Sequence, residues 1–260
     1  MKRILMIGDV FGRPGRRAVR TFLPRLIERH NADFVVINAE NAAGGFGITP
    51  DIVQELFDYG ADVLTGGNHS FDKAEGHEVL KTTDHVLRPH NYPAENPGTG
   101  VTVVKRADFS VAVLNLQGRV FLPLTDCPFK TADELIEEVK SKADIILVDL
   151  HAEATSEKMA MAWHLDGRVS GLVGTHTHVQ TADEQIFPNG MAYITDLGMT
   201  GPHRSIIGVK IQQSLGRFLN GRPSRFEPAK GDIRLHGVVI EIDESSGRAI
   251  SIERIQERAE

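Results

Sequence analysis

The chain has 260 residues, 41% of them hydrophobic and 25% charged, a composition that excludes wholesale disorder and is typical of a globular protein with a substantial core. A formal net charge of −6 argues against duplex DNA as a partner, although a local basic pocket remains open. The single cysteine, Cys127, excludes an intrachain disulfide framework and favours a reducing cytoplasm.

In the first half of the chain, short apolar runs alternate with amphipathic segments. The runs predict buried strands at residues 3–10, 33–40 and 62–69. The three- and four-residue spacing of apolar side chains predicts helices at residues 16–31 and 49–60. Pro24 lies inside the first of these helices and could kink or split it. A β-hairpin is expected at residues 99–118, with its turn near Ala107-Asp108.

The same alternation continues in the second half. It predicts strands at residues 144–153 and 169–179 and helices at 131–143, 156–167 and 206–221. A second hairpin is expected at residues 234–255, turning at Glu244–Gly247. The alternation favours α/β layers, and the hairpins require some antiparallel strands, so we expect a mixed sheet or a two-sheet sandwich.

Neither a linker nor an internal repeat divides the chain, and a single domain over residues 1–260 is therefore expected. The apolar run at the N-terminus breaks at Gly8-Asp9, which is too early for a signal peptide. No later run has the length needed to cross a bilayer, so the sequence predicts a cytoplasmic protein without a membrane partner. Exposed strand edges would permit a homo-oligomer.

Polar side chains follow five of the predicted strands at the point where each strand ends. They are Asp9, Glu40, Asn41, Asn68, His69, His151, His176 and His178. Because ligand sites in α/β sheets form at the carboxyl ends of strands, we expect these side chains to converge. In extended backbone, residues two apart point the same way, so His176 and His178 should leave their strand toward one site.

These residue types favour a metal centre. Carboxylates, carboxamides and imidazoles without a thiolate suit Mn, Fe, Zn or Ni better than copper(I) or an iron–sulfur cluster. Six or seven donors are too many for one ion but suit two ions about 3.5 Å apart. Each residue alone could instead be a turn former or, for His151, a core histidine, and only their combination argues for metal.

The ordered motifs GDVFG, NAEN, GGNHSFD, LHAE and GTHTHV resemble those of the calcineurin-like metallophosphoesterases. They are most similar to the YmdB-like branch, whose members hydrolyse 2′,3′-cyclic nucleotides. The resemblance implies an α/β fold (α+β in some schemes) in which two packed mixed sheets are flanked by helices as a four-layer sandwich. Two departures from the superfamily pattern are features of that branch: Phe11 replaces a histidine ligand, and Glu40 replaces the bridging aspartate.

The resemblance also implies a division of the ligands between two metal ions. The first ion would be held by Asp9, Glu40, Asn41 and His178, and the second by Asn68, His151 and His176, with Glu40 bridging. Iron, manganese or both are expected, with zinc as an alternative. His69 would not bind metal but would protonate the leaving oxygen or hydrogen-bond the substrate phosphate. Asp72 could orient His69 or cap the following helix.

The expected function is that of a dinuclear phosphodiesterase acting on small 2′,3′-cyclic nucleotides such as 2′,3′-cAMP. A hydroxide bridging the metals would attack phosphorus in line, and His69 would act as general acid. The alternatives are a phosphomonoesterase or nuclease on the same site, or a regulatory, RNA-associated protein with a vestigial site. The arginines between Arg13 and Arg20 could be a solvated helix face or bind phosphate, and the role of His203 stays open.

Overall fold

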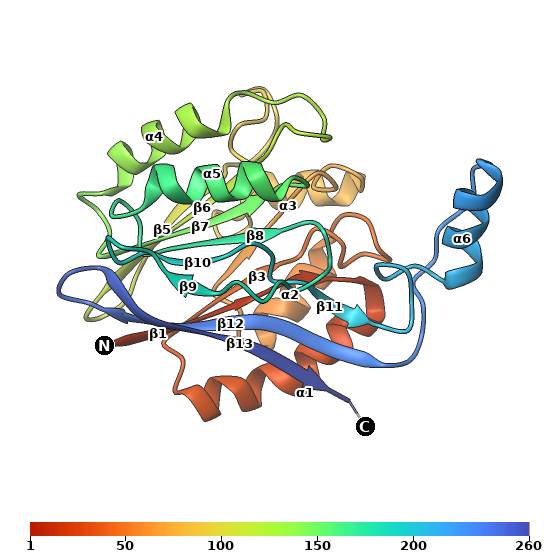
Figure 1. The fold of residues 1–260 in the computed structure, drawn as a ribbon, viewed down its shortest axis with the longest axis horizontal. Helices are drawn as coiled ribbons and strands as arrows, with labels where there is room; N and C mark the ends of the chain where they lie inside the picture. Colours follow the sequence, from red (N-terminus) through yellow and green to blue (C-terminus); the bar gives the residue numbers. More distant parts are fainter. Residues whose placement is uncertain (260) are drawn as a thin grey trace.

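The computed structural model of the chain describes residues 1–259 and has two mixed β-sheets packed face to face (Figure 1). The first sheet has the order β2 (Asp9–Val10), β11 (Met199–Pro202), β12 (Ile233–Asp243), β1 (Lys2–Ile7), β3 (Phe34–Asn38) and β4 (Val63–Thr65), and β13 (Arg248–Arg258) also pairs with β12. The second has the order β5 (Val101–Lys105), β6 (Ser110–Gln117), β7 (Ile145–His151), β8 (Gly171–Thr175), β10 (Ala192–Ile194) and β9 (Gln185–Ile186).

Each sheet contains a block of neighbouring parallel strands. In the first sheet β1, β3 and β4 run parallel, whereas β12 is antiparallel to β1. In the second sheet β6, β7, β8 and β10 run parallel, with antiparallel β5 and β9 at its edges. The carboxyl ends of parallel strands lie at one edge of a sheet, which is where ligand sites of α/β folds form.

Helices cover the outer faces of the two sheets. Helices α1 (Gly12–His30) and α2 (Pro50–Asp58) cover the first sheet, with α3 (Ala74–Thr82) beside α2, and α4 (Pro128–Val139) and α5 (Thr155–Leu165) cover the second (Figure 1). Helix α6 (Ile211–Asn220) stands apart from these layers. None of the helices in residues 1–259 combines the length and apolar character needed to span a membrane.

The alternation of side chains along each strand explains the layers. In β1, Leu5 and Ile7 pack against the helices of the first sheet, whereas Ile4 and Met6 pack between the two sheets. Strands buried on both faces need continuous apolar runs, which is what the sequence shows. Burying each such side chain contributes about 1.5–3 kcal/mol. The predicted α/β fold with two mixed sheets in a four-layer sandwich is confirmed.

Most predicted elements are present, with shifted ends. Both hairpins are confirmed, and the second turns at Glu244–Gly247 as expected. The predicted strand at residues 3–10 is broken at Gly8, since a Cβ there would lie 1.9 Å from the carbonyl oxygen of Gly198. Helix α1 begins four residues earlier than predicted and includes Pro24 without ending there.

Three parts of the chain differ more from the prediction. Helix α3 lies in a stretch where no element was expected. Helix α6 begins at Ile211 rather than at residue 206, because Ile206 and Val209 exchange backbone hydrogen bonds in a tight turn. Strand β8 ends at Thr175, so the prediction of a strand continuing to residue 179 is wrong.

Candidate metal centre

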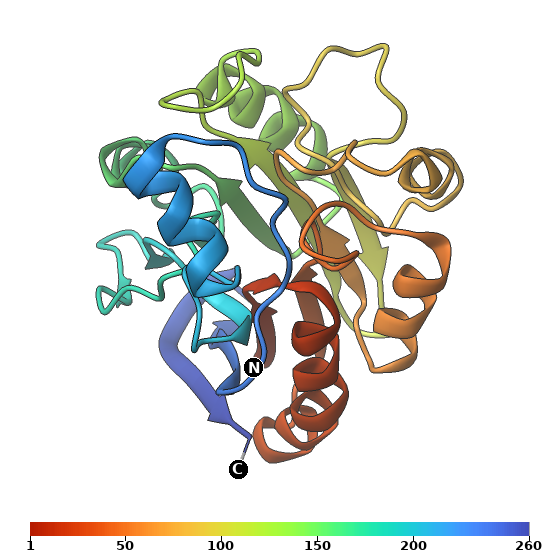
Figure 2. The same ribbon diagram turned by 90° about the vertical axis from the view of Figure 1, so that its right-hand side faces the viewer.

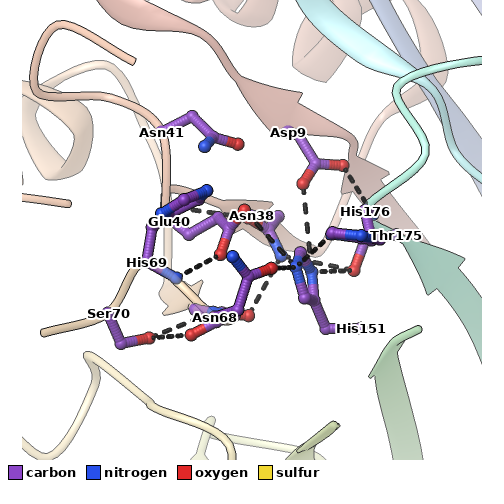
Figure 3. A network of polar contacts seen from close by, with 12 residues as sticks. Asp9, Asn38, Glu40, Asn41, Asn68, His69, Ser70, His151, Thr175 and His176 are labelled. Carbon is purple, nitrogen blue, oxygen red and sulfur yellow. Dashed lines mark hydrogen bonds and ion pairs between the residues drawn. The ribbon is translucent and has the colours of Figure 1, made fainter. Parts of the chain in front are cut away.

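All seven predicted metal ligands lie together at the carboxyl ends of the parallel strands. Two groups of potential ligands, each with its ligand atoms within 4.8 Å of one another, share Glu40: Glu40 with His151 and His176, and Glu40 with Asp9 and His178. Asn68 contacts the first group and Asn41 the second. Side chains from five strand ends thus reach one place, as the sequence analysis expected (Figure 3).

In the first group, three potential metal-ligand atoms lie close to Nε2 of His151. Oδ1 of Asn68 lies 2.9 Å from this nitrogen, Nδ1 of His176 lies 3.0 Å from it, and Oε1 of Glu40 lies 3.3 Å from it. His151 and Glu40 are almost completely buried. Gly67 makes room for them, because a Cβ there would lie 2.5 Å from Nε2 of His151.

In the second group, Nε2 of His178 lies 3.1 Å from Oδ1 of Asn41 and 3.8 Å from Oδ1 of Asp9. Within the described chain, Oδ1 of Asp9 is buried and has no hydrogen-bond donor. A buried carboxylate oxygen without a partner is costly, and a cation would satisfy it. Phe11 cannot replace the missing histidine ligand; its ring packs against His178 edge to face, with centroids 5.6 Å apart.

Hydrogen bonds to the opposite ring nitrogen fix the tautomers of two of the histidines. The Thr175 hydroxyl donates to Oδ1 of Asp149 at 2.7 Å, so it can only accept the proton on Nδ1 of His151, 3.0 Å away. Nδ1 of His178 likewise donates to the carbonyl oxygen of Ile207 at 2.9 Å. Such contacts leave the Nε2 lone pairs facing the site, as in metal-bound histidines.

His176 is oriented the other way round. Its Nε2 lies 3.0 Å from Oε2 of Glu153 and its Nδ1 lies 3.0 Å from Nε2 of His151, so Nδ1 is the ring nitrogen that faces the site. The lone pairs of His151 and His176 would repel each other at 3.0 Å unless a proton or a metal ion lay between them. The donor set thus fits cations of hard to borderline character.

The electrostatics of the metal-free site point the same way. Burial lowers the pKa of His151, but the charges of Glu40 and Asp9 outweigh it and raise the pKa to about 9. Burial, followed by the charge on His151, lowers the pKa of His176 to about 3. Burial also raises the pKa of Asp9. The raised pKa of His151 shows that the surrounding carboxylates favour a positive charge at the place that the ligand atoms offer to a cation.

Beneath the ligands, Asp149 ties the two sheets together. Its carboxylate accepts hydrogen bonds from Thr175 in the same sheet and from Asn38 and Thr65 in the other. All four side chains are buried. The network holds the carboxyl ends of β3, β4, β7 and β8 next to one another, directly under the candidate ligands.

A second buried support carries the segment with His176 and His178. Nζ of Lys158 donates to the carbonyl oxygen of Thr175 and to Oδ2 of Asp196, both at 2.8 Å. Asp196 also accepts the backbone N–H of Thr177 at 3.1 Å. Lys158 and Asp196 have no exposed surface.

The backbone between these supports is not extended. The φ angles of His176 and His178 are 99° and 65°, in a region that L-residues rarely adopt. The two rings do reach one site as expected, but the expected reason, alternation along a strand, is wrong. Ile207, whose carbonyl accepts from His178, also has a positive φ, 45°. Such strain is concentrated at functional sites and is maintained by the surrounding contacts.

His69 lies at the rim of the centre and contacts a ligand through its backbone. Its N–H donates to Oε2 of Glu40 at 3.0 Å, while its ring Nδ1 lies 2.8 Å from Oδ2 of Asp72. Helix α3 is capped at Lys73 without a side-chain bond, so Asp72 orients His69 rather than capping the helix. Phe46 packs against the His69 ring, with centroids 4.9 Å apart.

The sequence analysis missed the residues that support the ligands. Glu153 lies in the LHAE motif, but its contact with His176 had no sequence signal. Asp149 had one: it is a charged residue inside a run of apolar residues, and a buried charge needs partners. Lys158 and Asp196 are 38 positions apart, and nothing in the sequence pairs them.

Comparisons with known proteins show which family the chain resembles. The family model of the YmdB-like proteins matches residues 5–255. The chain is 50% identical over 253 residues to a Bacillus subtilis protein named 2′,3′-cyclic-nucleotide 2′-phosphodiesterase, covering 97% of this chain and 96% of that protein. A crystal structure of a hypothetical protein from Thermus thermophilus superposes with a TM-score of 0.93 at 42% identity, covering 98% of this chain and 99% of that one. A novel phosphatase from Mycoplasma pneumoniae gives a TM-score of 0.93 at 37% identity, covering 99% and 93%.

Proposed function

This chain belongs to the YmdB-like family, and we propose that it is a metal-dependent phosphodiesterase that hydrolyses 2′,3′-cyclic nucleotides such as 2′,3′-cAMP. The observation that carries the proposal is the pair of donor clusters that share Glu40. The Bacillus subtilis relative, which is named for this activity, supports the substrate class.

In this proposal Asp9, Asn41 and His178 hold one metal ion, and Asn68, His151 and His176 hold the other. Glu40 belongs to both clusters and would bridge the ions. Two metal ions supply a water nucleophile at neutral pH and offset the charge on the phosphate. The donor set supports iron or manganese, with zinc as the alternative. The metal ions would give Oδ1 of Asp9 the partner that it lacks. They would also accept the lone pairs of His151 and His176, which otherwise face each other.

His69 is proposed as the general acid. Asp72 accepts the Nδ1–H, so the doubly protonated ring carries a second N–H, on Nε2, whose proton can pass to the leaving oxygen of the ribose. An alkoxide is a poor leaving group, and proton transfer to it contributes about 10²–10⁴-fold to the rate. The half-exposed position of His69 at the rim lets the ring meet a bound substrate.

The proposal covers the organisation of the chain as well. The two sheets share one buried layer between them, which supports a single domain. The single cysteine supports a place in the cytoplasm.

Reconstitution of the metal-free protein tests the function. We expect anaerobically added Fe²⁺ or Mn²⁺ to bind at two ions per chain and to activate hydrolysis of 2′,3′-cAMP far above that of 3′,5′-cAMP, p-nitrophenyl phosphate or RNA. Glu40→Gln removes the shared carboxylate and should lose both metal and activity. Glu28→Gln, an exposed change on α1, is the matched control and should lose neither.

Several outcomes would overturn the proposal. Full activity with fewer than two metals per chain would exclude the dinuclear centre. Faster turnover of the monoester or of RNA would identify a phosphomonoesterase or a nuclease on the same site. Tight metal binding without turnover of any of these substrates would favour the regulatory alternative.

A further inference from the structure

A large cavity is lined by none of the candidate metal ligands, but its lining includes Ala43, two residues along the chain from Asn41. It has a volume of about 930 Å³ and lies between the start of α1, the loop after β3, the start of α3 and the segment that joins α6 to β12. Figure 2 shows that segment running down from α6 beside the first turns of α1. The volume is in the range of cavities that hold small organic ligands.

The lining of the cavity is basic, in a protein whose net charge is −6. The charged residues that line it are Arg13, Arg16, Arg17, Lys73, Lys230 and Glu75. The Arg16 guanidinium already donates hydrogen bonds to Glu55 and to the carbonyl oxygen of Ala42. Within residues 1–259 the other four cations have no ion-pair partner, and they come from three separate parts of the chain. Their arrangement attracts an anion with more than one charge.

The rest of the lining is apolar. Ile52, Pro228 and Ile233 contribute to it, as does the ring of Pro14. A cavity lined by both apolar and cationic side chains fits a nucleotide, whose base and sugar contact the apolar residues and whose phosphates contact the cations. A free metal ion or an inorganic phosphate would leave the apolar residues without a contact.

One loop contributes both to this cavity and to the metal centre. Ala43 and Gly44 line the cavity, while Asn41, a predicted ligand, begins the same loop. Asn41 is held there because its carbonyl oxygen accepts from the backbone N–H groups of Gly12 and Gly45. Three residues of chain span at most about 11 Å, so the cavity begins within one or two nucleotide lengths of the centre.

We propose that this cavity binds the nucleotide that precedes the one carrying the cyclic phosphate, so that the enzyme acts on oligoribonucleotides ending in a 2′,3′-cyclic phosphate. The inference rests on the proposed function and extends its substrate class. A cyclic mononucleotide has a single phosphate, which the metal centre uses, and it leaves the four free cations without a partner. In an RNA end, the preceding phosphodiester supplies that partner. Water adds across one P–O bond of the ring: phosphorus gains the hydroxyl, and the released ribose oxygen gains the proton.

The test compares two substrates in one enzyme. For the metal-loaded wild type we expect kcat/KM for ApApA ending in a 2′,3′-cyclic phosphate to exceed that for 2′,3′-cAMP by about 10-fold. This preference should fall as salt is added, because binding releases salt cations from the RNA phosphates. Arg17→Gln/Lys230→Gln removes two lining cations, one from α1 and one from the segment that joins α6 to β12, and should cut the ratio of the two kcat/KM values to near one. Arg25→Gln, an exposed change on the same helix outside the cavity, should leave the ratio unchanged.

A binding assay separates this inference from the proposed function. The probe is 5′-fluorescein-labelled ApApA with a 3′-phosphate, and fluorescence anisotropy on metal-free protein gives its Kd. We expect the double variant, but not Arg25→Gln, to weaken binding by about 10-fold. If the wild type hydrolyses neither substrate, the proposed function fails. The anisotropy result alone then shows whether the cavity binds the oligonucleotide. A wild-type ratio near one, or unchanged binding by the double variant, would overturn the inference even where 2′,3′-cAMP is hydrolysed.

Discussion

Replacing Lys158 with methionine should destabilise the protein and loosen the segment that carries two of the candidate ligands. The Lys158 ammonium lies in a fully buried position, 2.8 Å from both the Asp196 carboxylate and the Thr175 carbonyl oxygen. Methionine has a similar length but neither charge nor donor. Lys158→Met therefore leaves a buried carboxylate without its counter-ion.

The size of the effect follows from these contacts. Removing one partner of a buried ion pair costs about 3–5 kcal/mol, because the other charge stays buried. Asp196 keeps two backbone donors, the N–H groups of Thr177 and Gly198, which places the cost near the lower end. Against a total stability of about 5–15 kcal/mol, this is a large fraction. With a urea m-value of about 2–3 kcal/mol/M, the midpoint should fall by about 1–2 M.

Urea unfolding of the metal-free protein measures the change directly. Two further variants make the result specific. Lys158→Met/Asp196→Asn removes both charges and should recover at least about 2 kcal/mol relative to the sum of the single changes. Lys142→Met removes an exposed lysine that pairs with Glu138 four residues away, and it should change the stability by less than about 0.5 kcal/mol.

The reasoning has a second consequence in metal binding. Thr177 lies between His176 and His178 and is held by Asp196, so loss of Lys158 should also weaken metal binding. The argument is refuted if Lys158→Met is within about 0.5 kcal/mol of the wild type, or if the double variant is no better than the sum of the single ones.

Three further predictions concern single contacts. Thr175→Val removes the acceptor that orients the His151 ring and should weaken metal binding about 10–100-fold, as measured by titration against a chelator. Asp72→Asn should slow hydrolysis of 2′,3′-cAMP about 10-fold, because His69 loses its orienting carboxylate. The same change should hardly affect a p-nitrophenyl phosphodiester, whose leaving group needs no proton. Burial and the neighbouring His203 lower the pKa of His236 to about 3, so the folded protein keeps this ring neutral. The neutral ring's contribution to stability is present above the unfolded pKa of about 6.5 and is lost as the pH falls toward 3. Between pH 7.5 and 5.5 the free energy of unfolding should fall by about 1.4 kcal/mol for this reason. In His236→Phe, the free energy of unfolding measured in urea should depend less on pH by the same amount.

Each of these has an opposite outcome that would count against it. Unchanged metal affinity in Thr175→Val would show that the His151 ring is oriented without this bond. Equal slowing of both phosphodiesters by Asp72→Asn would argue for a role in substrate binding rather than in proton transfer. A pH dependence in His236→Phe that matches the wild type would show that the imidazole is not the group that titrates.

The sequence predicted the candidate ligands well because their signal is local. Asp9, Glu40, Asn68 and His151 each stand where an apolar run stops, and parallel strands bring such positions to one edge. The layers were predictable for a similar reason, since runs that are apolar on both faces require cover on both faces.

The supports of the site could not be predicted in this way. Asp149 receives hydrogen bonds from residues 84 and 111 positions away, and Lys158 meets Asp196 only after the second sheet has formed. The bend after β8 was missed because a positive φ at a histidine has no sequence signal. In both cases long-range contacts, rather than local preference, determine the local structure.

The two donor clusters depend on the packing of the sheets as much as on the ligands. In each cluster the carboxylates follow strands of the first sheet and the histidines belong to the second: Glu40 meets His151, and Asp9 meets His178. A shift of one sheet past the other would therefore open both clusters at once. Asp149 opposes such a shift, because it joins β7 to β3 and β4 directly beneath the ligands. The buried polar network thus sets the spacing of the clusters, and the fold and the chemistry of the site depend on the same few contacts.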